Sequence, residues 1–337
     1  MSTPEAPTDA EHPVPTRRSW RHWTAVTLSI LLGLVYVFSL AAYAEAGQSK
    51  VDNGPPPVTD DGSGLNFAFD LVALDPVKGQ MSLRMFINPQ GSFYNEADGS
   101  FARSLRITVR YQTGGQVNRD IPAGSPVGGT TEFNMFVEGN PSTYPFDHYQ
   151  YGWPSDADKA RAIDDPDDVE LSDPAPLLSV TELGPDGQPL PTRIPMGVYP
   201  SSGLQGWTEK WNFSVSEQPV GNAVPGDTLM LHMDIKRGGG VLAFVVVVLT
   251  LMVVTAVLSA LVARSVARKR RPIEATMAGW FAALLFALVP LRTNMPGSPP
   301  IGAWIDVAIF YWVELGLLIA MAVFIGSWLR YRKPPID

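Results

Sequence analysis

The chain has 337 residues, a formal net charge of −8 at pH 7 and no cysteine. The absence of cysteine excludes cysteine nucleophiles, thiolate metal sites and iron–sulfur clusters. Residues 46–237 hold 25 acidic and 13 basic side chains, so the negative charge belongs to this central region. An acidic surface repels phosphate, and we therefore expect no nucleic-acid partner.

The N-terminal part of the chain predicts a tail followed by a membrane anchor. Residues 1–16 are rich in Pro, Thr, Ser, Glu and Asp, which predicts a disordered tail. In residues 17–46, arginines precede an apolar run from Trp23 to Ala44 that is long enough to cross a bilayer. A small-x-small pattern ending at Ala44 leaves signal-peptide cleavage open, and the arginine pair leaves twin-arginine export open. Because the run is longer than a signal-peptide core, we expect an uncleaved anchor with a cytoplasmic N-terminus.

A linker at residues 47–64 leads into an outer domain at residues 65–237. Eight segments of this domain alternate apolar and polar side chains between clusters of Gly, Pro, Asn and Asp. They cover residues 65–72, 81–87, 105–111, 130–137, 144–153, 177–183, 207–215 and 228–235. No helical periodicity separates them, so the pattern predicts an all-β fold, either an antiparallel sandwich or a barrel.

Three apolar stretches near the C-terminus predict transmembrane helices. They lie at residues 238–263, 276–291 and 303–329. Basic side chains crowd the loop 264–275 and the tail 330–337, whereas the loop 292–302 has one. The positive-inside rule places the basic loop and tail in the cytoplasm. We therefore predict a multi-pass plasma-membrane protein with an extracytoplasmic all-β sandwich and four transmembrane helices, one N-terminal and three C-terminal.

Three charged side chains fall in or beside the predicted helices. Glu314 lies near the middle of the last one, where a carboxylate is costly and usually faces a bundle interior, a cavity or a partner. It is a candidate proton or ion site or packing switch; the structural alternative is a protonated side chain hydrogen-bonded to a neighbouring helix. Arg292 and Asp306 lie near the outer interface on consecutive helices, and we expect them to pair across the short loop.

An acidic segment at residues 156–173 contains candidate calcium ligands. These are Asp164, Asp165, Asp167 and Asp168. No EF-hand spacing is present, and such clusters also build solvated loops, which is the interpretation we favour. The four histidines have no metal-ligand spacing, and the sequence contains no nucleophile elbow, phosphate loop or dinucleotide fingerprint. We therefore expect no catalytic residue, no cofactor and no enzymatic activity.

One short motif resembles the signature loop of pentameric ligand-gated ion channels. The motif is Tyr144-Pro145-Phe146-Asp147, followed by Gln150. Arg237 precedes the first C-terminal helix, as a basic residue does in that family. The resemblance implies an outer β-sandwich followed by membrane helices, with this loop at the membrane face.

The link between the last two helices also resembles that family. The matching positions are Arg292, Met295-Pro296, Pro300 and Ile305-Asp306-Val307. In the family's pattern the second helix lines a pore with small hydroxylated residues, whereas residues 280–286 contain none. The resemblance implies a ring of subunits gated through contact between the loop and this link.

As a whole, the chain resembles an uncharacterised actinobacterial membrane-protein family, typical of mycobacteria, that is defined by a domain of unknown function. Our first hypothesis is a non-enzymatic envelope protein whose sandwich binds a partner or ligand and whose three C-terminal helices mediate assembly. The second is a channel-like oligomer, and the third is a transporter accessory subunit that uses Glu314. The expected partners are the membrane and either further copies of the chain or another envelope protein.

Overall fold

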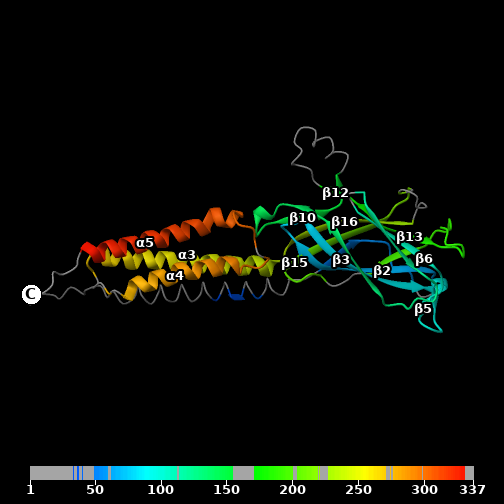
Figure 1. Cartoon of the computed structure of the whole chain (residues 1–337), viewed down its shortest axis with the longest axis horizontal. Helices are drawn as coiled ribbons and strands as arrows, with labels where there is room; N and C mark the ends of the chain where they lie inside the picture. The colour runs from blue at the N-terminus through cyan, green and yellow to red at the C-terminus, as the bar shows by residue number, and fades with distance from the viewer. Residues whose placement is uncertain are drawn as a thin grey trace, which may run out of the picture.

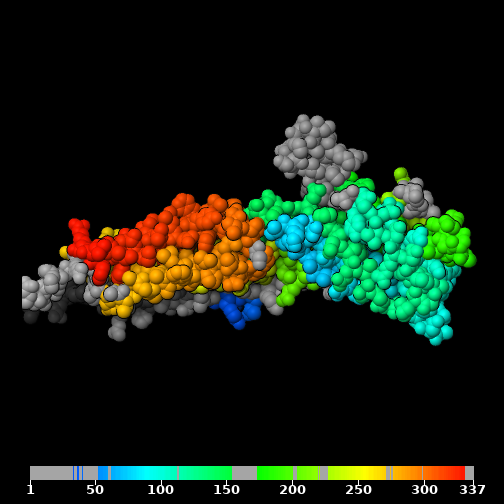
Figure 2. All heavy atoms as spheres, viewed as in Figure 1, coloured from blue at the N-terminus to red at the C-terminus, as the bar shows by residue number. Residues whose placement is uncertain are grey.

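The computed structural model describes residues 33, 36–37, 40, 49–59, 62–111, 114–154, 171–199, 203–218, 220, 227–270, 274, 276–297 and 299–330. The molecule is elongated, with three helices side by side at one end and the β-sheets at the other (Figure 1 and Figure 2). The predicted N-terminal anchor lies outside the described residues except at four helical positions, 33, 36, 37 and 40. The predicted N-terminal tail and the cleavage position at Ala44 lie wholly outside them.

The larger sheet has eight strands. Their bounds are β1 Ser49–Asn53, β6 Leu105–Arg110, β7 Gln116–Ile121, β9 Glu138–Gly139, β10 His148–Tyr151, β13 Ala175–Glu182, β15 Trp207–Val215 and β16 Thr228–Arg237. Six of them follow the order β1-β15-β16-β13-β6-β7, while β10 pairs with β16 and β9 pairs with β10. Strand β16 is therefore at the centre of the sheet, bonded to three neighbours.

The smaller sheet has four strands in the order β14-β2-β3-β8. Their bounds are β2 Gly64–Asp75, β3 Gln80–Gln90, β8 Thr130–Phe136 and β14 Met196–Tyr199. Two short pairs complete the described β structure: β4 Tyr94–Asn95 with β5 Ser100–Phe101, and β11 Trp153–Pro154 with β12 Leu171–Asp173. Two 3₁₀ turns, η1 Gly91–Phe93 and η2 Pro141–Thr143, connect strands.

The β domain is mixed, so the prediction of a purely antiparallel fold is wrong. Strand β1 pairs with β15 in parallel, and β14 pairs with β2 in parallel. Parallel partners need a long connection between them, and local alternation of side chains does not encode such a pairing. Each of the eight predicted segments contains a strand, but the segment predicted at 144–153 begins with a loop and becomes a strand only at His148.

The inner faces of the two sheets share one hydrophobic core. Alternate side chains of β15 are buried, as expected for a strand with one face in the core. The ring of Phe69 on β2 stacks on Phe213 on β15, with centroids 5.4 Å apart, and so joins the two sheets. Burial of this aromatic and aliphatic surface is the main term that stabilises the domain without disulfides.

The helices follow the β domain directly. Their bounds are α3 Gly239–Ala267, α4 Thr276–Thr293, a π-helical turn η3 Asp306–Phe310 and α5 Tyr311–Arg330, which continues η3. Within the described part of the chain, α3, α4 and the continuous segment Asp306–Arg330 are long and apolar enough to cross a membrane. This confirms the prediction of three C-terminal helices and indicates a membrane protein.

Local backbone chemistry sets both ends of α3. At its start, only Gly238 separates β16 from the helix. The N–H of Gly238 donates to the carbonyl of Gly206 at 2.9 Å and holds this residue in place. At its end, Lys269 adopts a left-handed conformation with φ of 57°. The N–H of Arg270 then bonds to the carbonyl of Ser265 at 3.1 Å, which closes the last turn as in a Schellman motif.

Candidate functional site at the junction of sheets and helices

The loop before β10 reaches from the β domain to the helices. It begins with η2, where Asn140 Oδ1 accepts the N–H of Ser142 at 2.9 Å and so caps the turn. Pro145 has no backbone N–H to give to a sheet, which fits a loop here better than the strand that alternation predicted. We call residues 144–147 the junction loop.

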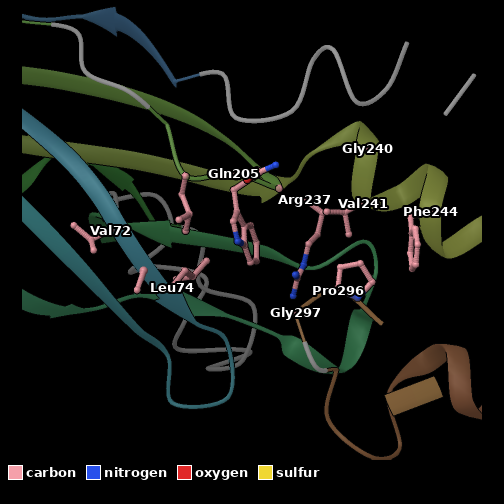
Figure 3. A pocket seen from close by; sticks show the side chains of 13 residues that line it. Val72, Leu74, Gln205, Arg237, Gly240, Val241, Phe244, Pro296 and Gly297 are labelled. Carbon is pink, nitrogen blue, oxygen red and sulfur yellow. The ribbon is translucent and has the colours of Figure 1, made fainter. Parts of the chain in front are cut away.

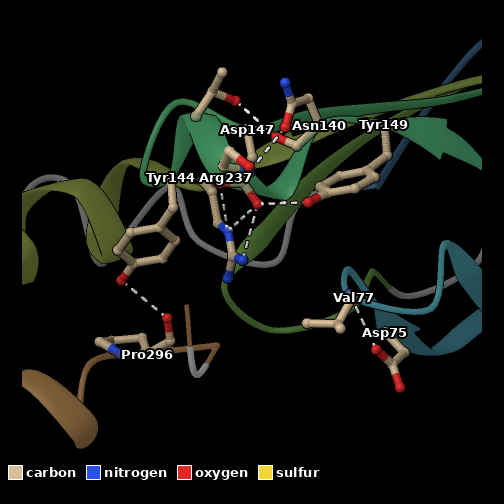
Figure 4. Close-up of polar contacts among 10 residues, drawn as sticks. Asp75, Val77, Asn140, Tyr144, Asp147, Tyr149, Arg237 and Pro296 are labelled. Atoms are coloured by element: carbon tan, nitrogen blue, oxygen red, sulfur yellow. Dashed lines mark hydrogen bonds and ion pairs between the residues drawn. The ribbon is translucent and has the colours of Figure 1, made fainter. Parts of the chain in front are cut away.

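Asp147, the last residue of this loop, forms a buried ion pair with Arg237. Asp147 is 1% exposed and Arg237 is 8% exposed. Arg237 Nε donates to Asp147 Oδ1 at 3.0 Å, and its Nη2 donates to Oδ2 at 2.9 Å (Figure 4). The hydroxyl of Tyr149 also donates to Asp147 Oδ2, at 3.1 Å. The carboxylate is thus held by donors from β10 and from the last residue of β16.

Two aromatic rings pack against the same guanidinium. Arg237 Cζ lies 4.0 Å from the ring centroid of Trp207 and 5.0 Å from that of Tyr144. The position is also closed from the helix side, because a Cβ on Gly297 would collide with the guanidinium of Arg237. Gly297 has φ of +77°, a conformation that favours glycine. The guanidinium is therefore neutralised and enclosed on several sides.

Tyr144 connects the β domain to the link between α4 and η3. Its hydroxyl donates to the carbonyl of Pro296 at 2.9 Å, and its ring packs in the hydrophobic cluster of the helices (Figure 4). Burial raises the pKa of Tyr144 to about 12, so the phenol remains a hydrogen-bond donor at neutral pH. Phe146 adds a second, more exposed contact, an edge-to-face packing on Trp304 with centroids 6.3 Å apart.

Arg292 and Asp306 are paired across the link, as we expected from their positions. Arg292 Nε donates to Asp306 Oδ1 at 3.0 Å, and Nη2 donates to Oδ2 at 2.6 Å. The same guanidinium donates to the carbonyls of Pro299 and Pro300 at 3.0 and 2.8 Å. Asp306 also accepts the N–H of Gly302 at 2.9 Å. This pair fixes the shape of the link that Tyr144 contacts.

Gln150 lies apart from the junction, on the other face of β10. Its amide nitrogen donates to Asp234 Oδ1 at 3.2 Å, and His148 lies 3.1 Å from the same oxygen. His232 lies 3.5 Å from the second oxygen. Partial burial raises the pKa of Asp234. The hydrogen bond with His148 and the charges of His232 and His148 lower it further than burial raises it, so the pKa of Asp234 lies below its ordinary value. The sequence did not reveal this cluster, because only the pairing of β10 with β16 assembles it.

A cavity of about 610 Å³ opens between the β domain and the first turns of α3 (Figure 3). Its walls are mainly apolar, with Trp207, Leu204 and Leu74 on the domain side and Phe244 on the helix side. Arg237 is its charged lining residue, and that charge is already paired with Asp147. Pro296, which accepts the hydrogen bond of Tyr144, also lines this cavity, so the cavity adjoins the Tyr144 contact.

Beside this cavity, Glu209 is a buried carboxyl that sequence reasoning missed. It is 0% exposed on β15; Oε1 accepts the N–H of Leu204 at 2.6 Å, and Oε2 accepts the indole N–H of Trp211 at 3.0 Å. Burial raises the pKa of Glu209 to about 7, with a further upward contribution from the charge of Asp70. It occupies an inward-facing position of β15, between the buried Trp207 and Trp211, where a carboxyl is uncommon.

Glu314 lies away from the junction, in a groove between α4 and α5. Among the described residues no hydrogen-bond or ion-pair partner contacts its side chain. The candidate calcium ligands Asp164, Asp165, Asp167 and Asp168 lie outside the described residues. Within the described ranges, no group of three or more His, Asp or Glu side chains is arranged to hold a metal ion.

Two family models divide the chain at the junction. One, described as a domain of unknown function (DUF4436), matches residues 55–224, and the other, described as a domain of unknown function (DUF8686), matches residues 237–331. The second begins at Arg237, the residue that pairs with the junction loop. No curated protein matches the chain. Residues 55–224 are 170 of the 337 residues, half of the chain, and the chain therefore belongs to the family defined by the domain of unknown function DUF4436.

Proposed function

We propose that this chain is an integral plasma-membrane protein whose β domain lies outside the cytoplasm and binds a partner or ligand. The helices anchor the domain and assemble it with other membrane components, and the protein acts by binding rather than by catalysis. The observation that carries this proposal is the buried pair Arg237–Asp147, which stands where the sheet becomes a membrane helix. Movement of a domain joined in this way is transmitted to the helices.

The distribution of basic residues supports the proposed orientation. Arg264, Arg268, Lys269 and Arg270 lie at the end of α3 that is far from the β domain, and Arg330 ends α5 at the same side (Figure 1). Basic residues accumulate on the cytoplasmic side of membrane helices. The β domain, at the opposite end of the helices, is therefore extracytoplasmic, with the N-terminus before the predicted anchor and the C-terminus both inside. The resemblance to an actinobacterial family favours a cell-envelope setting.

The contacts at the junction support a coupled arrangement rather than a loose tether. A free linker would leave the β domain to move independently, whereas Tyr144 and Arg237 both contact the link that joins α4 to η3. Asp147 and Arg237 both belong to the β domain, and their pairing holds Arg237 against Gly297 of the link while the Tyr144 hydroxyl bonds to Pro296 there. Movement of the domain is therefore accompanied by movement of this link.

Orientation is tested with single cysteines, which label cleanly because the chain has none of its own. Val117, 52% exposed on β7, and Arg270, after α3, are each replaced by cysteine. In intact cells a membrane-impermeant maleimide labels Val117→Cys, and it labels Arg270→Cys only after permeabilisation. Labelling of Arg270→Cys from outside, with Val117→Cys protected, overturns the proposed orientation.

Coupling is tested at Ile301, which is 90% exposed in the link. The maleimide labelling rate of Ile301→Cys is compared between the otherwise unchanged chain and the Asp147→Asn variant. Loss of the charge at Asp147 loosens the link and changes this rate. An exposed ion pair within the β domain provides the control, and Asp120→Asn, which removes the partner of Arg106, leaves the rate unchanged. Equal rates in all three proteins contradict coupling.

A second candidate function is a channel-like oligomer, and one observation favours it. The junction loop rests on the α4–η3 link through Tyr144 and Phe146, which is the contact that the resemblance to pentameric ligand-gated channels implies. The channels that the chain resembles surround one axis with identical subunits, so such a protein would form a closed ring. Native mass spectrometry of the detergent-purified full chain tests this candidate. A ring justifies recording currents in lipid bilayers, and a strict monomer rules the channel out.

A further inference from the structure

The cavity between the β domain and α3 has the size and the lining of a ligand site. It measures about 610 Å³, and binding sites for small molecules are roughly 300–1,000 Å³ in volume, with mainly apolar walls and few polar groups. The domain wall contains Leu74, Leu204 and Trp207, and the helix wall contains Val241 and Phe244 (Figure 3). We call this space the junction cavity.

Arg237 brings one donor nitrogen, Nη1, to the wall of the junction cavity. The residue is 8% exposed, and its Nε and Nη2 donate to Asp147 (Figure 4). Among the described residues, Nη1 donates to no acceptor. Nη1 lies toward Gly297, because a Cβ there would collide with this atom, and Gly297 also lines the cavity. A buried charged donor without an acceptor is costly, so an oxygen atom held in the cavity stabilises it.

The charges at the junction cavity favour a neutral acceptor on the ligand. Arg237 is the one charged residue in the described lining, and Asp147 already neutralises it. A carboxylate or phosphate in the cavity would share this single cation with Asp147, and a buried charge without a partner of its own is costly. The oxygen that Nη1 binds is therefore uncharged, as in the carbonyl of an ester.

The length of α3 places the junction cavity at the surface of the membrane. The helix has 29 residues, so at about 1.5 Å per residue it is about 43 Å long. The hydrocarbon core of a bilayer is about 30 Å thick, and the interfacial regions bring the total to about 40–45 Å. The first turn of α3 therefore lies in an interfacial region, where the ester groups of membrane lipids lie. Phe244 is 47% exposed, so the helix wall of the cavity extends to the surrounding lipid.

We propose that the junction cavity binds a lipid of the outer leaflet, whose ester carbonyl accepts a hydrogen bond from Arg237 Nη1. The acyl chain next to this ester packs on Trp207 and Phe244, and the pair of Arg237 with Asp147 stays intact. The bound lipid contacts both the β domain and α3. This inference deepens the proposed function by naming a class of ligand, and it rests on the proposed orientation for the choice of leaflet.

Binding is tested with a photoactivatable lipid on the detergent-purified full chain. The probe is a phosphatidylcholine whose acyl chain carries a diazirine close to the ester carbonyl, and mass spectrometry locates the labelled peptides. We expect label on residues 204–207 of the β domain as well as on the first turns of α3. Lipid that only surrounds the helices labels α3 but does not reach residues 204–207.

A substitution that fills the cavity provides the comparison. Ala73 is an exposed residue of β2 in the cavity lining, so Ala73→Trp places a large ring there without disturbing the core. It should reduce the label on residues 204–207 at least about tenfold, because a tenfold loss needs only the equivalent of one or two buried methylene groups. Val117→Trp is the matched control. It adds the same ring at an exposed position of β7 outside the cavity lining and should leave the label unchanged.

The hydrogen bond is tested by competition with unlabelled lipids. A phosphatidylcholine with ester-linked chains should displace the probe from residues 204–207. Its ether-linked analogue has the same chains without the carbonyls, and it should compete at least about tenfold more weakly, as expected for the loss of a bond to a charged donor. Both lipids should reduce the label on the remainder of α3 equally, which controls for their partition into the micelle.

Four results overturn the inference. Absence of label on residues 204–207, or equal label there in Ala73→Trp, shows that no lipid occupies the cavity. Equal competition by the ester and ether lipids shows that Arg237 does not bind the carbonyl. A fatty-acid carboxylate that competes better than the ester lipid assigns the cavity to an anion. These measurements in detergent do not depend on orientation, which Val117→Cys labelling in intact cells tests, so failure of this inference is distinguishable from failure of the proposed orientation.

Discussion

The β domain and the helices place their apolar side chains in opposite ways, inward in the domain and largely outward in the helices. In the domain, strands bury alternate residues and turn polar residues outward, as β3 does along most of its length. The helices bury few of their residues within the chain. In the most apolar 18-residue stretch, the buried share is 22% for α3, 17% for α4 and 28% for Asp306–Arg330. Two charged groups of the helical region, Arg292 and Asp306, are instead paired with each other inside it. The domain is complete by itself in water, whereas the helices depend on lipid or on further helices.

The junction joins these two regions, and it combines a strand residue with a buried charge. Arg237 is a charged side chain at the end of a strand, yet it is almost fully buried and enclosed by rings. Like Arg292 in the helical region, Arg237 is a buried cation paired with a carboxylate, although it belongs to the sheet. Substitutions there should therefore affect both regions, and substitutions elsewhere should affect only one.

The largest expected effect follows from Arg237→Ala. The change leaves the carboxylate of Asp147 buried without its charged partner, which costs about 3–5 kcal/mol of unfolding free energy. Chemical denaturation of the full chain in detergent measures the loss. Arg106→Ala breaks an exposed pair with Asp120 and should change stability little. Equal effects of the two substitutions would show that burial of the Arg237 pair is unimportant.

A smaller effect, dependent on pH, is expected from Glu209. Its pKa is raised to about 7 in the folded chain and is about 4.5 when exposed, so the folded state holds the proton more tightly. The stability from this group is full below about pH 4.5 and is lost as pH rises towards 7. The shift corresponds to about 3 kcal/mol. Glu209→Gln should flatten the unfolding free energy of the chain over this window; an unchanged slope would contradict the assignment.

Tyr144→Phe removes a single hydrogen bond between the β domain and the link. The variant loses the hydrogen bond to the carbonyl of Pro296, at a cost of about 1 kcal/mol, and keeps the ring over Arg237. It should also raise the maleimide labelling rate of Ile301→Cys. Tyr151→Phe is the matched control, because it removes a hydroxyl that bonds to Pro176 inside the β domain. If both variants change the labelling of Ile301→Cys equally, the Tyr144 bond has no special role at the junction.

The smallest effect is expected from Phe146→Ala. Phe146 is 68% exposed and Trp304 is 55% exposed, so their edge-to-face contact is worth about 0.5–1.5 kcal/mol at most. The midpoint of thermal unfolding should barely change. A large loss of stability would show that the junction loop depends on this contact more than on Arg237.

Local patterns predicted the elements of this protein better than their partners. Alternation located strands such as β2 and β15, and apolar length located α3, because both signals lie within one segment. The parallel pairing of β14 with β2 joins segments about 130 residues apart, and no local pattern encodes it. The pairing of Arg292 with Asp306 was accessible because a short link joins their helices.

The candidate site was predicted only in part for the same reason. The junction loop stood out as a short motif, but its bond to Pro296 and its pairing with Arg237 cross 152 and 90 positions of sequence. Glu209 gave no signal, because a single inward carboxyl in an alternating strand looks like an ordinary exception. Its role becomes visible only when Leu204 and Trp211 are found as its donors.

The single residue between β16 and α3 has a rotational consequence. Nine residue pairs fix β16 against β15, and the helix begins immediately after Gly238. The ladder of the sheet therefore sets the azimuth of α3. One residue inserted at Gly238 would turn the helix by about 100° and advance it by about 1.5 Å. Met252, which is buried in the helix cluster, would then turn away from it, so the register of the sheet determines which side of α3 packs against the other helices.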